Sequence, residues 1–446
     1  MMEKLDIQQV RAGRKLGQPV FGADGVLLFP PGRILTQEDL DTLARNGLTR
    51  ISLFPAAREA GTAPPPAASL TRSGAAADPD VRPPFFYTRS HDASSDGIPA
   101  LDERSIEKIV DYTAERFRLM DVDDPLVAEL FNIAVERQIK VYHDKPSRIP
   151  SWPRHSGLLP GPERPRDVSM QKLTATSHRI GTLPTIFHRL IGMINNPIVN
   201  SEELSKVIAV DPALTAKLLK LVNSPFFGLP YKIDSISRAV LIVGTKQLVM
   251  LAMGATLISA FKGLPVSLVN MQSYWSHSIS CGAACRLLCA RAGIQDAESF
   301  FVAGLLHDIA RLLIYVQLPD HARYIVTEAA RRNIPVRDME METLGFTHED
   351  LGAELLRSWN CPDELVQRVH KHHQVPAPDC PAEDVILPTA NMLSQALGYG
   401  SSGEMIIPPQ PPVAWTKIGL NTEGLCMLCA ELDNDVRELR TVFTPV

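Results

Sequence analysis

The sequence lacks the features of secreted, membrane-spanning and nucleic-acid-binding proteins. Its longest apolar run, Leu248 to Phe261, is shorter than the ~20 residues that cross a bilayer and is followed at once by Lys262. The first residues mix charged and apolar side chains and contain no signal-peptide run. A net charge of -5 gives no basic bias toward nucleic acid. We therefore expect a cytoplasmic protein with no membrane insertion and no nucleic-acid partner.

Two further absences lower the priority of several enzyme classes. No Gly-rich loop is present to cradle a phosphate, and no strand-turn-helix elbow presents a nucleophile. The seven cysteines form no paired framework, so reduced thiols are expected. Cys281, Cys285 and Cys289 share one helix face, where buried thiols are favoured over soft metal ligands. Cys426 and Cys429 are interpreted as a helix face as well.

The N-terminal region predicts a small α+β module. Asp24-Gly25 separates two short apolar runs as a hairpin turn requires. A helix is expected from Thr36 to Gly47, followed by a strand from Arg50 to Phe54. The Ala-, Pro- and Ser-rich residues after it have too little apolar content to form a core, which is typical of a flexible linker.

Helical spacing dominates the rest of the chain, and the fold class is therefore mainly α. Two helices are expected in the tail, near Ala382 to Leu397 and Thr422 to Leu439. The predicted segments are the N-terminal module (1–54), the Pro-rich linker (55–100), a helical pair (101–150), the main all-helical domain (169–375) and a C-terminal helical extension (376–446).

The strongest chemical signal is the His307-Asp308 pair inside an apolar helical run. Burying a carboxylate there is costly unless a cation or a metal compensates. Histidines on other predicted helices or helix ends are available to join the pair: His277, His348, His372 and His373. A helical bundle can aim such side chains at one site, and imidazole with carboxylate suits iron, manganese or zinc.

A structural alternative accounts for the same residues. The His-Asp pair can form a hydrogen bond in a core that holds no metal. His372 and His373 can bind terminal carbonyls at a helix end and complement the helix dipole. The sequence leaves both interpretations open.

Several separated motifs resemble the HDOD family when they are taken together. In chain order they are DPALTAKLLKLVNSPFFG, ISRAVLIVGTKQLVMLA, GLLHDIARLL, THEDLGAELLRSWNCP and HKHH. The resemblance covers about Leu173 to Val375. It implies an all-helical relative of HD phosphohydrolases that serves as a signalling output or scaffold domain rather than as a hydrolase. The N-terminal module is similar to a small domain found before HD-GYP regions.

The resemblance extends to the HD-GYP phosphodiesterases, which hydrolyse cyclic di-GMP. It implies the metal ligands His277, His307, Asp308, His348, His372 and His373. Three departures stand out. Residues 374–376 replace the glycine-tyrosine-proline signature, Asn391 stands at a late aspartate position, and Arg311 stands where a lysine is usual, as an auxiliary catalytic candidate. An amide is a poorer metal ligand than a carboxylate.

We therefore expect a bacterial signal-transduction protein that binds a partner through a degenerate HD-type domain. The expected partner is a signalling protein, and a nucleotide is the other ligand class. The alternative function is a metal-dependent phosphohydrolase acting on a cyclic dinucleotide. Only this second function needs iron, manganese or zinc, and convergence of the histidines would favour it.

Overall fold

The computed structural model describes most of the helical region and short stretches before residue 54. In the helical region the described residues are 101–121, 123–143, 146–150, 168–175, 184–194, 201–261, 268–409 and 413–443. The chain divides into two compact units, Met1–Asp102 and Glu103–Val446.

Short strands pair in the first unit. β1 (Glu3–Asp6) pairs antiparallel with β4 (Arg50–Leu53), and β2 (Val20–Phe21) pairs antiparallel with β3 (Leu27–Phe29). The turn expected at Asp24-Gly25 lies outside the described residues. Most of the helix expected from Thr36 to Gly47 and all of the linker lie outside the described residues.

The described residues of the second unit form helices and no strand, which confirms the mainly helical fold class. The first helices are α2 (Glu103–Arg116), α3 (Pro125–Tyr142), η2 (Pro146–Arg148), α4 (Met170–Ala175), α5 (Thr185–Ile194), α6 (Ser201–Ala209), α7 (Pro212–Val222), η4 (Pro225–Phe227), α8 (Ile236–Val243) and α9 (Thr245–Phe261). They are followed by α10 (Met271–Ala292), α11 (Ala297–Leu306), α12 (Ile309–Gln317), α13 (Pro319–Arg332), α14 (Val336–Leu344), α15 (His348–Ser358), α16 (Asp363–Lys371), α17 (Glu383–Ala396), α18 (Val413–Ile418) and α19 (Thr422–Phe443).

Side-chain caps fix where several of these helices begin. Asp211 accepts hydrogen bonds from the backbone N–H groups of Ala213 and Leu214, and Pro212 occupies the first position of α7. Thr347 and Asp350 form a capping box at the start of α15. This box makes His348 the first residue of its helix, with its position fixed by the cap.

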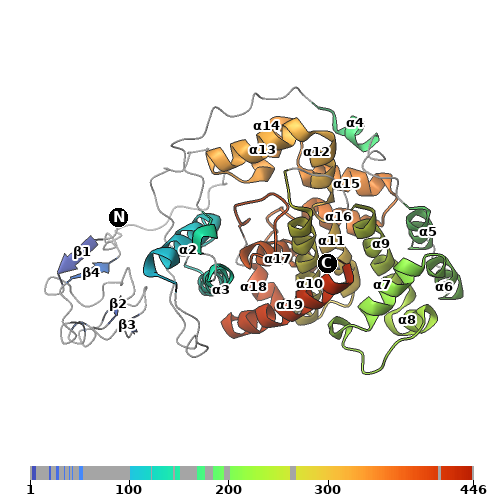
Figure 1. Ribbon diagram of the computed structural model, residues 1–446, viewed down its shortest axis with the longest axis horizontal. Helices are drawn as coiled ribbons and strands as arrows, with labels where there is room; N and C mark the ends of the chain where they lie inside the picture. The colour runs from blue at the N-terminus through green and yellow to red at the C-terminus, as the bar shows by residue number, and fades with distance from the viewer. Residues whose placement is uncertain are drawn as a thin grey trace. The chain divides into compact units, whose positions relative to one another are not determined.

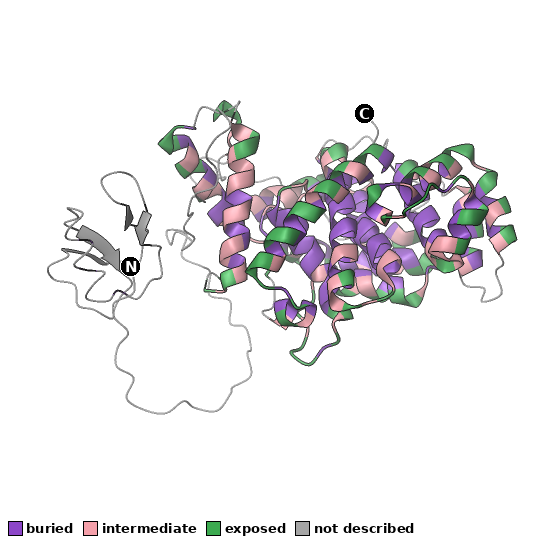
Figure 2. Cartoon of the chain, turned by 90° about the horizontal axis from the view of Figure 1, so that it is seen from below, coloured by how far each residue is buried: buried purple, intermediate pink, exposed green. Residues whose placement is uncertain are grey.

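Helices α10 and α11 form the centre of the second unit (Figure 1). α10 packs against α11, α17 and α19, and α11 packs against α9. Buried residues fill this interior while exposed residues cover the outside (Figure 2). Cys281, Cys285 and Cys289 are free and buried in α10, which confirms them as core thiols. Burial raises the pKa of the Cys285 thiol.

The stretch Ala297–Gln317 has the length and hydropathy of a membrane-spanning helix, but 94% of its apolar window is buried inside the protein. It is also interrupted at His307 and Asp308, between α11 and α12. Both properties are those of a core segment.

Two glycines set the distance between α10 and α11. A Cβ atom on Gly304 would lie 2.6 Å from the Cα of Gly282, and one on Gly282 would lie 2.7 Å from the carbonyl oxygen of Phe301. The two backbones therefore touch directly. Because His277 precedes this contact on α10 and His307 follows it on α11, the contact also sets how closely the two imidazoles approach.

We predict that Gly304→Ala lowers the free energy of unfolding by at least about 1–3 kcal/mol, because backbone atoms of α10 have to move. Urea denaturation measures the change. The control is Gly192→Ala in α5, where an added Cβ meets nothing within 4 Å. That variant should gain about 0.5–1 kcal/mol from helix propensity. An equal change in the free energy of unfolding in the two variants would show that the α10–α11 backbones are not in tight contact.

Candidate metal centre

Six predicted site residues come from four places in the fold. His277 lies in the middle of α10, and His348 begins α15. His307 and Asp308 form the break between α11 and α12. His372 and His373 follow the end of α16. The helix break matters because adjacent side chains on a continuous helix point about 100° apart; here the two residues address one centre.

The first set of ligand atoms, the three-ligand group, consists of His277, His307 and Asp308. Nε2 of His277 lies 3.2 Å from Nε2 of His307. Oδ2 of Asp308 lies 3.5 Å from the first nitrogen and 3.2 Å from the second. These separations match ligands of one ion, since metal–nitrogen bonds of 2.0–2.1 Å in a tetrahedron place ligand atoms about 3.3–3.4 Å apart.

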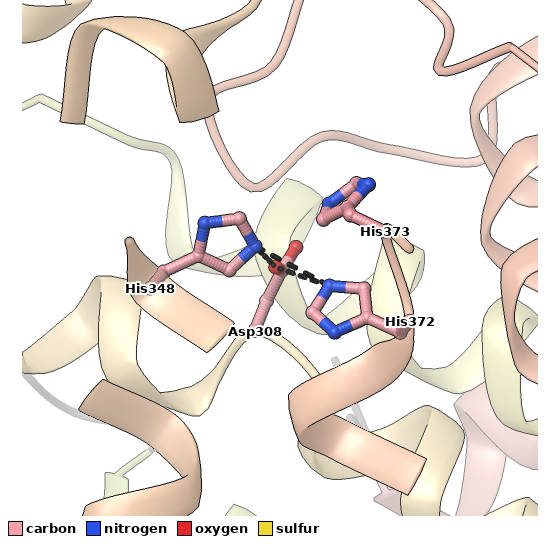
Figure 3. A group of neighbouring side chains, drawn as sticks. All are labelled: Asp308, His348, His372 and His373. Atoms are coloured by element: carbon pink, nitrogen blue, oxygen red, sulfur yellow. Dashed lines mark hydrogen bonds and ion pairs between the residues drawn. The ribbon is translucent and has the colours of Figure 1, made fainter. Parts of the chain in front are cut away.

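The second set, the four-ligand group, shares Asp308 and adds His348, His372 and His373 (Figure 3). Oδ1 of Asp308 lies 3.1 Å from Nε2 of His348 and 3.8 Å from Nε2 of His372. The two imidazole nitrogens are 3.3 Å apart. Each oxygen of the Asp308 carboxylate thus serves one group, so the residue can bridge two neighbouring positions.

Hydrogen bonds at Nδ1 turn four of the imidazoles toward Asp308. His307 donates from Nδ1 to the Gly304 carbonyl at 2.8 Å, and His372 donates to the Val369 carbonyl at 2.6 Å. A carbonyl only accepts, so Nδ1 carries the proton in both rings and Nε2 presents a lone pair. Two further bonds at Nδ1 act in the same way: His348 to Glu340 at 2.6 Å, and His277 to the Ser394 hydroxyl at 3.0 Å.

The donor set fits a transition metal. Oδ1 of Asp308 is buried and meets no geometric hydrogen-bond criterion among the described residues; its neighbours are Nε2 of His348 at 3.1 Å and Nε of Arg311 at 3.6 Å, so the carboxylate needs positive charge beside it, from a metal or from these side chains. Imidazole nitrogens with one carboxylate suit zinc, iron or manganese. The cluster is thus able to hold metal, while the individual ligand roles stay a prediction.

When no metal is bound, protonated histidines balance the negative charge of the buried carboxylate. Burial lowers the pKa of His277, whereas in His307 the Asp308 carboxylate outweighs burial and raises the pKa. His372 has its pKa lowered to about 3 by burial and by His307. Burial and Arg311 also disfavour charge on His348, but Glu340 and Glu349 raise its pKa to about 9. In each close pair the shifts favour protonation of one ring over the other: His307 over His277, and His348 over His372.

Arg311 is a counter-ion inside the core. Its Nε lies 3.6 Å from Oδ1 of Asp308 and 3.5 Å from Oε1 of Glu340. Burial opposes the charge, but these carboxylates raise the pKa of Arg311. Its Nη2 also lies 3.4 Å from Nδ1 of His348. Because that Nδ1–H already donates to Glu340, we interpret this contact as repulsion between donors rather than as a hydrogen bond.

The sequence interpretation missed the residues that surround the ligands. Glu340, on α14, accepts from both Nδ1 and the backbone N–H of His348. It shares the buried face of α14 with Val336 and Thr343. An acidic residue on the buried face of a helix is unusual, and this pattern in the sequence could have indicated that Glu340 belongs to the site. Ser394 and Glu404 lie beyond the predicted main domain and carried no such signal.

Asn391, predicted at a degenerate ligand position, is buried in α17, three residues before Ser394. Its Oδ1 accepts from Gln395 at 3.0 Å. Its Nδ2 has no hydrogen-bond partner among the described residues. Since Ser394 lies three residues later, the two residues share a face of α17.

The residues matched by one protein-family model include every predicted ligand of the three-ligand and four-ligand groups. A model of the HDOD domain matches residues 180–375. Residues 180–375 carry an HDOD domain. This confirms the resemblance found in the sequence motifs.

The chain spans less than half the length of the curated relative it matches, whereas nearly all of each similar solved chain is covered. An uncharacterized protein of Treponema pallidum (strain Nichols) is 31% identical over 224 residues, 48% of this chain, and the match spans 42% of that relative. A solved HDOD domain protein of unknown function from Geobacter sulfurreducens is 23% identical, with 62% of this chain and 97% of that chain covered and a TM-score of 0.48. A Shewanella amazonensis protein named as a candidate phosphohydrolase is 22% identical, with 62% and 100% covered and a TM-score of 0.49.

We predict that metal-free protein loses stability in alkali because His348 deprotonates. Its folded pKa of about 9 lies above the unfolded value of 6.5. Its contribution is therefore complete below pH 6.5 and is lost as the pH rises through 9, by about 3 kcal/mol. Glu340→Gln should flatten this loss, since it removes a carboxylate that raises the pKa.

Urea denaturation of chelator-treated protein at pH 6, 7.5 and 9.5 measures the effect. The matched control is Glu342→Gln, on the same helix, whose carboxylate pairs with Arg332 at the surface. An unchanged slope in Glu340→Gln would contradict the role assigned to Glu340.

Proposed function

We propose that this chain is a bacterial signalling protein whose HDOD domain acts by binding a protein partner in the cytoplasm. In this proposal the His/Asp centre holds metal ions that stabilise the shape of the domain. Val210, which follows α6, is 69% exposed and Leu241, on α8, is 78% exposed, so apolar side chains are available in this region for contact with a partner.

The observation that carries this proposal is the closure of the centre. His277, His307 and His348 are 0% exposed, and Asp308 and His372 are 1% exposed. Structural metal sites are enclosed by their protein ligands, whereas catalytic sites keep a position open to solvent or substrate. The four-ligand group already offers four side chains, as a closed tetrahedral site requires.

A metal-dependent phosphohydrolase is the second candidate, and the convergence of the histidines favours it together with one further observation. The three-ligand group leaves a coordination position without a side chain, as catalytic sites do. Bound metal would supply Lewis acidity and a water of lowered pKa there. Asp308 and His277 would position the ions. For a phosphate ester to reach them, the chain around partly exposed His373 would have to open.

We predict that purified protein contains one to two equivalents of zinc, iron or manganese by elemental analysis, and that His372→Ala loses about one. The control is His370→Ala, two residues away, whose ring contacts Asp350 at 3.1 Å instead of joining the centre. Folded wild-type protein that takes up no added metal would contradict the metal part of the proposal.

We also predict no turnover of bis(p-nitrophenyl) phosphate or of a cyclic dinucleotide in the presence of Mn²⁺. The closed centre gives the reason. Turnover that disappears in Asp308→Ala would favour the second candidate over the first.

A further inference from the structure

Helix α17 lies between the metal centre and the helical pair α2–α3. One of its sides contacts α10, which carries His277, and α3 packs on the same helix. α17 lies outside the residues matched by the HDOD model. It packs mainly on α10 and α11, which lie inside the matched residues, while Arg116 and Arg137, which lie before them, bind its C-terminal end.

Ser394 connects α17 to the three-ligand group. Its hydroxyl lies 3.0 Å from Nδ1 of His277 and donates to the His277 carbonyl at 3.1 Å. The hydroxyl oxygen is then free to accept the Nδ1 proton, which leaves Nε2 facing His307 and Asp308. Ser280 also contacts the Ser394 hydroxyl. Ser394 is thus a positioning residue for His277.

Two arginines of the helical pair hold the C-terminal end of α17. Arg116, the last residue of α2, donates to the carbonyl of Gln395 at 2.6 Å. Arg137, on α3, donates to the carbonyl of Leu397 at 2.9 Å and to both carboxylate oxygens of Asp433 on α19. These carbonyls belong to the last turn and cap of α17, where cations complement the helix dipole.

The two held carbonyls, of Gln395 and Leu397, follow Ser394 within three residues. Gln395 follows Ser394 directly, and its side-chain amide also fixes Asn391 through a 3.0 Å hydrogen bond. Arg116 is bound from the other direction as well, since its carbonyl accepts from Ile407 at 2.9 Å. A shift of the helical pair therefore acts on the turn of α17 that orients His277.

We propose that the helical pair α2–α3 controls the metal affinity of the three-ligand group by clamping the end of α17 through Arg116 and Arg137, with Ser394 transmitting the clamp to His277. The inference rests on the proposed metal binding. The four-ligand group does not contain His277, and its histidines lie on α15 and after α16. Its metal affinity therefore serves as the internal reference in the same protein.

The test titrates full-length, metal-free protein with Zn²⁺ against a chromophoric chelator. Ser394→Ala should weaken one equivalent about tenfold and leave the other unchanged. The double variant Arg116→Ala, Arg137→Ala should weaken the same equivalent to a similar extent. Adding Ser394→Ala to the double variant should cause no further loss, because the three residues act in series.

The matched control is Arg118→Ala. Arg118 also donates to a backbone carbonyl, at 3.3 Å, but that carbonyl belongs to Asn333 at the end of α13. This variant should bind both equivalents as the wild type does. Equal weakening in Arg118→Ala, or wild-type binding by the folded double variant, would overturn the proposal. If the double variant unfolds, Arg137→Lys replaces it, since lysine keeps the charge but cannot bridge both partners.

A second readout needs no metal. The ring nitrogens of His277, observed by ¹⁵N NMR and assigned with His277→Gln, should report the Nδ1–H form in wild-type protein and a mixture of forms in both the double variant and Ser394→Ala. Unchanged His277 signals in the double variant would overturn the coupling. Wild-type protein that binds no Zn²⁺ but shows the NMR change would refute metal binding alone.

Discussion

The buried carboxylate of Asp308 is the interaction on which the rest of the centre depends. Its two oxygens address two sets of imidazoles, and Arg311 lies beside it. A charge at this depth is tolerated only with compensation from every side. The helix break, the capping box before His348 and the close approach of α10 and α11 each bring one compensating group to it.

Local signals in the sequence predicted much of this arrangement. The two tail helices appear as α17 and α19 near the expected residues. The histidines were found because their residue type is rare and their order matches a family motif. Which imidazole nitrogen faces the centre was not predictable, because that depends on partners such as the Gly304 carbonyl and Glu340.

Contacts distant in the sequence account for what was missed. Ser394 bonds to His277 across 117 residues, and Arg116 reaches Gln395 across 279. No periodicity or motif encodes such pairs, because they arise only when helices pack. The helical pair 101–150 was expected as a segment of its own. In the structure its arginines bond to the tail, within one compact unit.

Closure of the centre has a kinetic consequence. An ion in the three-ligand group, whose side chains are 0–1% exposed, can exchange only when the surrounding chain opens locally. Exchange would then be governed by the frequency of opening rather than by the concentration of free metal. The metal found in the folded protein would record which ion was abundant when the chain folded, and later changes in the cell's metal supply would reach it slowly.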